Sequence, residues 1–161
     1  PQPTLVQGLG DATGLAVGLL HSCALRRGGE VVCWGSGSAG RLGDGSEEER
    51  DRIVAVEGLK DAVAIAAGED HSCALRRGGE VVCWGSNSEG ALGDGTTSSR
   101  LVPVAVVGIP RARSVAAGEQ VSCALAAGGD AVHCWGRELG RLDAPRTWDV
   151  ARRPVAVRGL P

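Results

Sequence analysis

The chain has 161 residues, with no Phe, Tyr or Met, 26 Gly, six Cys and four Trp, and a formal net charge of -2. Without a cation excess or many aromatic stacking groups, this composition does not support binding to nucleic acid or to an anionic membrane surface. No run approaches the ~20 consecutive apolar residues of a membrane span, and Pro1-Gln2-Pro3-Thr4 is not the charged start of a signal peptide, so no membrane insertion is expected.

A repeat with a period of about 50 residues organises the sequence. The segment HSCALRRGGEVVCWG occupies residues 21–35 and recurs unchanged at 71–85, and VSCALAAGGDAVHCWG at 121–136 is a third copy with one inserted residue. A second marker, of the type PVAVxGL, follows the same period and begins at Thr4, Ile53, Pro103 and Pro154. We therefore treat residues 1–161 as one repeat domain, with units at about 4–52, 53–102 and 103–153 and a fourth copy of the marker at 154–161.

Each unit is expected to contain four short strands. In the second unit, the segments of strand character are Ala62–Ala67, His71–Leu75, Glu80–Trp84 and Leu101–Val107. The first of these consists largely of small residues, which suits an innermost strand crowded near an axis. A polar, Gly-rich connection at 86–100 precedes the fourth strand, and no helical periodicity competes with this interpretation. The pattern predicts an all-β fold in which each unit is a β-propeller blade of four antiparallel strands.

The second unit, AAGEDHSCALRRGGEVVCWGSNSEGALGDGTTSSRLVPVAV, resembles the repeat of the regulator-of-chromosome-condensation family. The shared marks are AAG, the HS-AL strand, the G-V-WG strand and the G-LG-G turn. The third unit departs from them, since Val121 replaces the histidine, Asp143 stands where Gly93 stood, and the loop at 137–153 differs. The resemblance implies a propeller, typically with about seven blades, that serves as a protein-binding platform.

Three blades form an open arc, which leaves two apolar blade faces uncovered. Such faces are covered either by the remainder of a longer propeller or by association of copies until a ring closes. Residues 1–100 are acidic in balance and residues 101–161 basic, which would assist association. The sequence leaves both arrangements open.

Each unit contains one pair of cysteines, and the three pairs are Cys23 with Cys33, Cys73 with Cys83, and Cys123 with Cys134. A hairpin turn around Gly28 places Cys23 opposite Cys33, and facing strands are about 4.5 to 5.5 Å apart, which a disulfide can bridge. The extra residue before Cys134 is expected to form a bulge beside Gly128-Gly129. Three disulfides within units predict an oxidising compartment, so that the protein would be secreted, periplasmic or on the cell surface.

The cysteines could instead be reduced thiols, zinc ligands or nucleophiles. Buried reduced thiols remain an alternative, and a zinc site would combine His21 and Cys23 with Cys33 on the facing strand. The C-x9-C spacing matches no standard zinc motif, and Val121 removes the histidine from the third unit. A Cys-His nucleophilic pair is disfavoured because catalytic groups are single and asymmetric, whereas this pair repeats with the blade. We therefore expect no metal, no cofactor and no catalytic residues.

The spacing of the other large side chains, which repeats between the units, indicates structural roles. His21 and His71 are expected at strand starts, with ring nitrogens bonded to neighbouring backbone. Trp34, Trp84 and Trp135 each follow or precede a cysteine, so they lie on the other face of the sheet, where they would pack against the adjacent blade.

One tryptophan has no counterpart in the other units. Trp148 lies near Arg146, Arg152 and Arg153, and an unmatched Trp beside Arg is typical of an interface anchor, although packing within a loop is an equal alternative. GDGS at 43–46 and GDGT at 93–96 suggest calcium, but one Asp per loop supplies too few oxygen ligands and a tight turn explains the motif. The acidic run at 47–52 is interpreted as a solvated loop tip that could recognise a basic partner.

These features favour an extracytoplasmic scaffold that binds an unidentified protein partner through its propeller loops. A self-assembling structural element that forms rings or arrays is the first alternative, because the end blades are uncapped. A propeller that inhibits a hydrolase by inserting loops is the second. Guanine-nucleotide exchange is not supported, since no blade carries a long inserted wedge.

Overall fold

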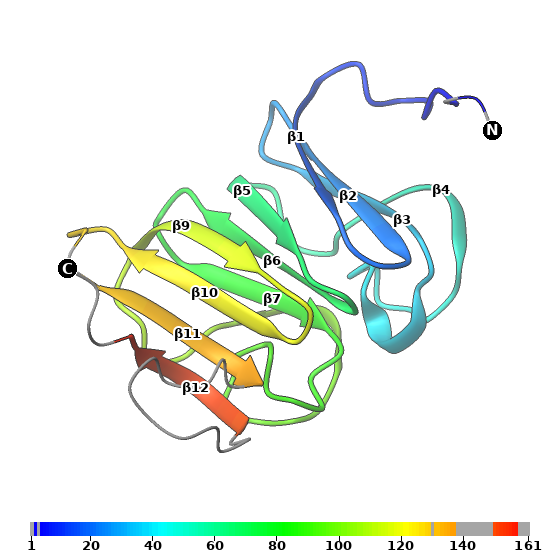
Figure 1. Cartoon of the computed structure of the whole chain (residues 1–161). Helices are drawn as coiled ribbons and strands as arrows, with labels where there is room; N and C mark the ends of the chain where they lie inside the picture. The colour runs from blue at the N-terminus through cyan, green and yellow to red at the C-terminus, as the bar shows by residue number, and fades with distance from the viewer. Residues whose placement is uncertain (1, 3, 130, 138–149, 158–161) are drawn as a thin grey trace.

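The computed structural model describes residues 2, 4–129, 131–137 and 150–157. These residues form three four-stranded antiparallel sheets, in the all-β architecture of propeller blades that the repeat predicts (Figure 1). The sheets are not closed into a ring. We call each sheet a blade.

The strands follow one another within each blade in chain order. Blade 1 contains β1 (Ala12–Val17), β2 (His21–Arg26), β3 (Val31–Gly35) and β4 (Arg50–Ala55). Blade 2 contains β5 (Ala62–Ala67), β6 (His71–Arg76), β7 (Val81–Gly85) and β8 (Arg100–Ala105). Blade 3 contains β9 (Ala112–Ala117), β10 (Val121–Ala126), β11 (Val132–Arg137) and β12 (Val150–Ala156). A short 3-10 turn, Ser38–Gly40, follows β3.

The first strands of the blades lie next to one another around a common side. β5 contacts both β1 and β9, whereas β4, β8 and β12 are the outer strands (Figure 1). Strands rich in small residues occupy this inner position, with the sequences ATGLAV, AVAIAA and ARSVAA, since the close approach of neighbouring blades leaves little room for large side chains.

The boundaries of the blades differ from those of the repeat units, which were defined by the start of each PVAVxGL marker. The blades span 12–55, 62–105 and 112–156, so the unit boundaries after residues 52, 102 and 153 fall inside β4, β8 and β12. The marker therefore ends the outer strand of each blade instead of opening the next unit. Its first copy, at 4–9, is not a strand.

A glycine at the end of β3 lies against the turn that joins β1 to β2. Gly35 has φ 103, and a Cβ there would lie 2.6 Å from the carbonyl oxygen of Leu20. Only glycine takes this conformation at that distance without strain, and Gly85 and Gly136 repeat it in the other blades. The WG dipeptide thus marks the end of the third strand in blades 1 and 2, and β11 extends one residue beyond it.

The disulfides form as the hairpin register predicts. Cys23 faces Cys33, Cys73 faces Cys83 and Cys123 faces Cys134, with Cα–Cα separations of 4.1 Å, and each pair is bonded. In blade 3 the β10–β11 register runs without a shift, and the inserted residue falls in the turn between Ala126 and Ala131, beside Gly128-Gly129.

Two apolar clusters hold the blades together, and both lie at boundaries between blades. The first joins one side of blade 1 to blade 2 through Cys23, Leu25, Val31, Cys33, Leu42, Val56, Leu59, Ala62, Ala74, Val82 and Trp84. The second joins blade 2 to blade 3 through Cys73, Leu75, Val81, Cys83, Leu92, Ala112, Ala124 and Trp135. Trp84 and Trp135 are 1% exposed, so the predicted packing of tryptophan against the adjacent blade is confirmed at both boundaries. Each disulfide of blades 1 and 2 is part of such a cluster.

Candidate interaction surfaces

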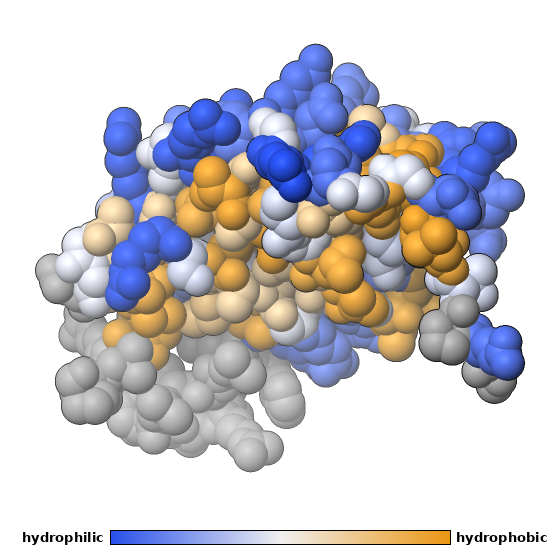
Figure 2. Space-filling view, turned by 90° about the horizontal axis from the view of Figure 1, so that it is seen from above, coloured by the Kyte–Doolittle hydropathy of each residue, from blue (hydrophilic) through white to orange (hydrophobic). Residues whose placement is uncertain are grey.

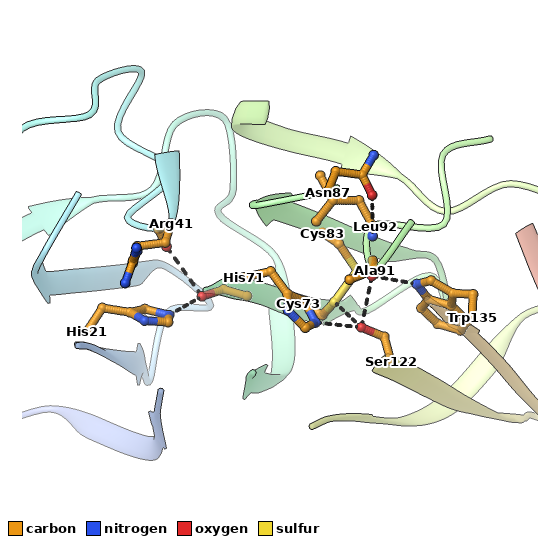
Figure 3. Close-up of a disulfide and its surroundings, with 11 residues drawn as sticks. His21, Arg41, His71, Cys73, Cys83, Asn87, Ala91, Leu92, Ser122 and Trp135 are labelled. Atoms are coloured by element: carbon orange, nitrogen blue, oxygen red, sulfur yellow. Dashed lines mark hydrogen bonds between the residues drawn. A yellow bond between two sulfur atoms is a disulfide. The ribbon is translucent and has the colours of Figure 1, made fainter. Parts of the chain in front are cut away.

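A polar network accompanies each apolar cluster. At the first boundary, Trp84 Nε1 donates to the carbonyl oxygen of Arg41 at 3.0 Å, and Ser72 Oγ donates to the same oxygen at 3.4 Å. At the second boundary, Trp135 Nε1 and Ser122 Oγ both donate to the carbonyl oxygen of Ala91, at 2.8 and 3.0 Å (Figure 3). Blades 1 and 2 each therefore offer one loop carbonyl to the next blade, which supplies a tryptophan and a serine.

The buried histidines complete these networks. His21 Nε2 lies 2.8 Å from Ser72 Oγ, and His71 Nε2 lies 2.8 Å from Ser122 Oγ. The expectation that their ring nitrogens bond neighbouring backbone was wrong: the partner is a serine side chain of the next blade, because the rings point out of the hairpin toward that blade. When each serine hydroxyl donates to its loop carbonyl, Nε2 is the donor in the histidine–serine bond.

This arrangement opposes a catalytic interpretation of the histidine–serine pairs. A histidine that donates to the hydroxyl cannot take its proton, so the serine is not activated as a nucleophile. Burial and, to a smaller extent, nearby Arg41 lower the pKa of His21 to about 4, against an opposing effect of Asp70. Burial and, to a smaller extent, His21 lower the pKa of His71 to about 4. The pairs are neutral links between blades.

The sulfur atoms and the loop carboxylates are already engaged. All six cysteines are in disulfides, which removes the thiolate ligands that zinc would need. Within the described ranges, no group of three or more His, Cys, Asp or Glu could hold a metal ion. In the GDGS and GDGT motifs, Asp44 and Asp94 accept hydrogen bonds from Ser46 or Thr96 and from Arg50 or Arg100. These carboxylates close the loop, as a tight turn requires.

The two ends of the blades differ in charge. One end, which we call the acidic rim, consists of the turns 18–20, 68–70 and 118–120 and the loops 36–49 and 86–99. Its acidic side chains are Asp44, Glu47, Glu48, Glu49, Glu69, Asp70, Glu89, Asp94 and Glu119. Arg41 is the basic side chain within these segments, and Arg50, Arg100 and Arg137 reach the same end of the blades from the adjoining strands, where they contact Asp44, Asp94 and Gln120. The opposite rim, at 27–30, 58–61, 77–80, 108–111 and 127–129, nearly balances Arg27, Lys60, Arg77 and Arg111 against Glu30, Asp61 and Glu80. Glu57 lies against the loop 36–49, since its amide donates to the carbonyl oxygen of Gly43.

Arg41 does not offset the charge of the acidic rim toward solvent. Its side chain is 6% exposed, its Nη1 lies 2.8 Å from Asp70 Oδ1, and its Nε donates to the carbonyl oxygen of Ser38. The ion pair joins blade 1 to blade 2. The carboxylates of Glu47, Glu49, Glu69, Glu89 and Glu119 form no ion pair within the described part of the chain.

The loops of the acidic rim are held by internal hydrogen bonds. Partial burial raises the pKa of Asp44, but hydrogen bonds from Ser46 and Arg50 outweigh it and hold that pKa below its usual value; Asp94 is lowered in the same way by Thr96 and Arg100. Both carboxylates are therefore ionised anchors for their loops.

Asn87 is a residue of the rim whose role no sequence pattern indicates. It is fully buried, its Nδ2 donates to the carbonyl oxygens of Thr96 and Ser98 and to Asp94 Oδ1, and its Oδ1 accepts from the amide of Leu92. One side chain thus closes the loop 87–98 from inside. Figure 3 shows its bond to the amide of Leu92. A lone Asn in a polar Gly-rich segment gives no sequence signal for this role, and blade 1 has Gly37 at the same position.

A shallow depression lies at the inner end of the acidic rim. It has a volume of about 320 Å³ and is lined by Val17, Gly18, Leu19, Ala67, Gly68, Glu69, Gly118 and Glu119. The amide of Leu19 donates to the carbonyl oxygen of Glu69, and that of Glu69 to the carbonyl oxygen of Glu119, so the three turns form one continuous edge.

The predicted interface residues are only partly visible. Trp148 and Arg146 lie outside the described residues. Arg152 and Arg153 are exposed on β12, and the carbonyl oxygen of Arg152 accepts from the amide of Gly95 in blade 2. The grouping of the four residues therefore remains a prediction.

Sequence comparison identifies the repeats directly. The family model described as the regulator of chromosome condensation (RCC1) repeat matches residues 28–75 and 78–125, and a second model of the same description matches 12–41 and 62–91. Comparison with curated proteins returns no match.

Solved structures share the fold over nearly the whole chain. Yeast RCC1 (Prp20), solved bound to Kap60, is 24% identical with a TM-score of 0.81 over 94% of this chain, and Prp20p from Saccharomyces cerevisiae is 25% identical with a TM-score of 0.78 over 94%. Human WBSCR16 is 22% identical with a TM-score of 0.79 over 90%. The chain spans 38% to 39% of the length of these three structures. Propeller repeats of this kind suggest protein–protein interaction in general, and the chain belongs to the regulator of chromosome condensation repeat family.

Proposed function

We propose that the chain is an extracytoplasmic interaction scaffold that binds a basic protein surface through its acidic rim. The observation that carries this proposal is the concentration of carboxylates at one end of all three blades, while the opposite end is nearly balanced. A one-sided array of like charges produces a local potential that attracts and orients an oppositely charged partner.

The rigidity of the rim supports recognition by preformed loops. Asp44 and Asp94 are pinned by arginine and hydroxyl groups, and Asn87 fills its loop from within. Loops that are ordered before binding lose little conformational freedom on association, which favours affinity. Glu47, Glu48 and Glu49 extend from one such loop as exposed side chains.

The disulfides support the location. Bonded cysteine pairs persist in secreted, periplasmic and cell-surface proteins and are rare in reducing compartments. Within the described ranges there is no helix that is long and apolar enough to span a membrane. Rapid alkylation of intact source cells tests the compartment: protein with no alkylated cysteine before reduction is expected, and protein with six alkylated cysteines would place it in a reducing compartment.

A solved structure with the same fold supports protein binding as the general function. The Saccharomyces cerevisiae protein is described with binding properties to Gsp1p and histones. Burial of both described histidine–serine pairs also favours a binding protein over an enzyme. The proposed function includes neither guanine-nucleotide exchange nor inhibition of a hydrolase.

Charge-neutral variants of each rim test the binding surface. The acidic-rim variant combines Glu47→Gln, Glu48→Gln and Glu49→Gln, and the control combines Glu30→Gln and Glu80→Gln on the opposite rim, where both residues are exposed. Affinity isolation from the extracytoplasmic fraction should recover a basic partner with the original protein and with the control, and lose it with the acidic-rim variant and at high salt. Equal recovery with all three proteins, or no partner from that fraction, would contradict the proposal.

A further inference from the structure

The rim loops of blades 1 and 2 share one framework. GDGSEEER occupies residues 43–50, and GDGTTSSR occupies residues 93–100. In each loop the aspartate accepts hydrogen bonds from the amide and the hydroxyl two residues later, and the arginine six residues later donates its Nε–H to the same carboxylate at 2.9 Å. The amide two residues beyond that hydroxyl donates to it at 3.3 Å in both loops. Equivalent side chains of the two loops therefore have equivalent surroundings.

The arginines of the two loops differ in one bond. Arg50 pairs with Asp44, and its Nη1 also lies 2.9 Å from Glu48 Oε2. In blade 2, Ser98 occupies the position of Glu48, and Arg100 Nη1 has no hydrogen bond or ion pair in the described part of the chain. The Arg100 side chain is 37% exposed. Blade 2 thus has a guanidinium donor without the carboxylate that its counterpart in blade 1 binds.

A second cation borders the loop of blade 2. A Cβ on Gly95 would lie 3.2 Å from Nε of Arg153, on the outer strand β12 of blade 3. Arg153 is exposed and has no ion pair among the described residues. Blade 2 has Val102 at the position of Arg153, and the side chain nearest to a Cβ on Gly45 of the blade 1 loop is the carboxylate of Glu57, at 3.0 Å. The loop of blade 1 therefore lacks this cation.

The balance of charge over the two loops has opposite signs. Residues 44–50 contain four carboxylates and one arginine, whereas residues 94–100 contain one carboxylate and one arginine, to which Arg153 adds a second cation. The blade 2 loop is therefore a cationic place within the acidic rim. Short, exposed hydroxyl side chains at 97–99 stand where blade 1 carries glutamates, so the space that a carboxylate fills in blade 1 is left open to a ligand.

We propose that Arg100, assisted by Arg153, binds a carboxylate side chain of the protein partner at the place that Glu48 occupies in blade 1. A guanidinium presents paired N–H donors to a carboxylate, which gives orientation as well as attraction. The identity of the ligand rests on the proposed function: the partner of the acidic rim carries an acidic residue within its basic surface. An exposed ion pair adds little affinity, but one unlike charge in an array of like charges fixes the orientation in which the partner docks.

The site is built before a ligand arrives. Asp94 holds the Arg100 guanidinium from one side, and Asn87 closes the loop from within. Blade 2 has a described blade on each side, and the site lies at the rim end of the boundary between blades 2 and 3. Its charged groups differ in chemistry from the apolar band that Figure 2 shows between hydrophilic residues.

Ser98→Glu is the variant that tests recognition of the partner. It gives blade 2 the residue of blade 1, whose carboxylate should pair with Arg100 and fill the site, and the equivalent loop accommodates Glu48. Thr97→Glu is the matched control, because it adds the same charge and the equivalent Glu47 forms no ion pair. General attraction between the acidic rim and a basic partner predicts that neither variant binds less. The proposed site predicts that Ser98→Glu alone weakens partner binding, by up to about fivefold.

Acetate tests the site in the chain by itself. Nitrogen-15 NMR spectra are recorded with sodium acetate and with sodium chloride at equal ionic strength. Acetate should move the Nε–H resonance of Arg100 and the amide resonance of Ser98 more than chloride does, in the original protein and in Thr97→Glu but not in Ser98→Glu. Glu48→Ser should produce the same response to acetate at Arg50, because it opens the equivalent place in blade 1. Thermal unfolding of each variant confirms that it is folded.

The outcomes separate this site from the binding surface of the acidic rim. Equal responses to acetate and chloride at Arg100, or an unchanged acetate response in Ser98→Glu, would overturn the site. An acetate response combined with partner binding that Ser98→Glu leaves intact would overturn its role in recognition, while the loss of binding on neutralising residues 47–49 would still support the proposed function. Recovery of no partner would contradict the proposed function, and the acetate response would still decide whether blade 2 carries the site.

Discussion

The ring of His21 and the hydroxyl of Ser72 lie 2.8 Å apart across the boundary between blades 1 and 2. The same His-Ser dipeptide begins β2 and β6, and successive residues of a strand point to opposite faces. Its histidine therefore bonds the following blade, and its serine bonds the preceding one. One dipeptide per blade is enough to link a series of blades in a fixed direction.

Removal of the Ser72 hydroxyl should destabilise the protein more than removal of the equivalent hydroxyl in blade 1. Ser72→Ala leaves the Nε2–H of His21 buried without an acceptor, at a cost of about 1 to 3 kcal/mol. Ser22→Ala is the matched control, because Ser22 is partly exposed and has no such partner within the described ranges. Denaturant unfolding measures both; equal effects of the two substitutions would contradict the assigned role.

Acidification should weaken the fold through the two buried histidines. Their folded-state pKa is about 4 and the unfolded value about 6.5, so the unfolded chain binds more protons between these limits. The free energy of unfolding should therefore fall as the pH decreases from about 6.5 to about 4, by up to roughly 3 kcal/mol per histidine.

His71→Gln separates this contribution from that of the carboxylates. Glutamine retains a donor toward Ser122 and does not titrate. Unfolding curves of the variant and the original protein at pH about 7, about 5 and about 4 should show a smaller loss of stability in the variant. Parallel pH dependence of the two proteins would show that His71 is not the titrating group.

Loss of one disulfide should lower stability without changing the strand pairing. The Cys73–Cys83 bond closes a loop with a sequence separation of 10, so the paired substitution Cys73→Ser and Cys83→Ser should cost about 2 to 3 kcal/mol in the loop-entropy account. Guanidinium unfolding measures this cost, and intact mass before and after reduction reports the two remaining bonds. An intact mass that indicates free thiols in the original protein would contradict the assigned bonds.

Asn87→Ala should loosen one rim loop and leave the blades intact. The substitution removes the donors to the carbonyl oxygens of Thr96 and Ser98 and the acceptor of the Leu92 amide, so hydrogen exchange at Leu92 should accelerate and proteolysis near 97–99 should increase. Ser88→Ala is the control, because Ser88 is exposed and adjacent. Unchanged exchange at Leu92 would show that Asn87 does not close the loop.

In blade 1 the equivalent Gly37 cannot be replaced by Asn, since a Cβ there would collide with the carbonyl oxygen of Glu48.

Much of the fold follows from short-range pattern. The strands of the second unit were predicted to within two residues, and the cysteines face each other because both lie five residues from one Gly-centred turn. The role of Trp84 also followed from alternation, since a residue next to a buried cysteine must point to the other blade. The blade boundaries were offset because the PVAVxGL marker shows where a strand lies and not which sheet it completes.

By itself, the sequence determined the repeat, the four strands of each blade and the pairing of the cysteines, because turns, alternation and hairpin register act over about ten residues. Only the tertiary structure decided that His21 bonds Ser72, that Asn87 closes a loop from inside and that the acidic turns and loops gather at one rim. These relationships join side chains from different turns or from blades about 50 residues apart in sequence. The partner of each side chain depends on how the blades pack against one another. That packing brings together residues far apart in the sequence, which no local sequence pattern specifies.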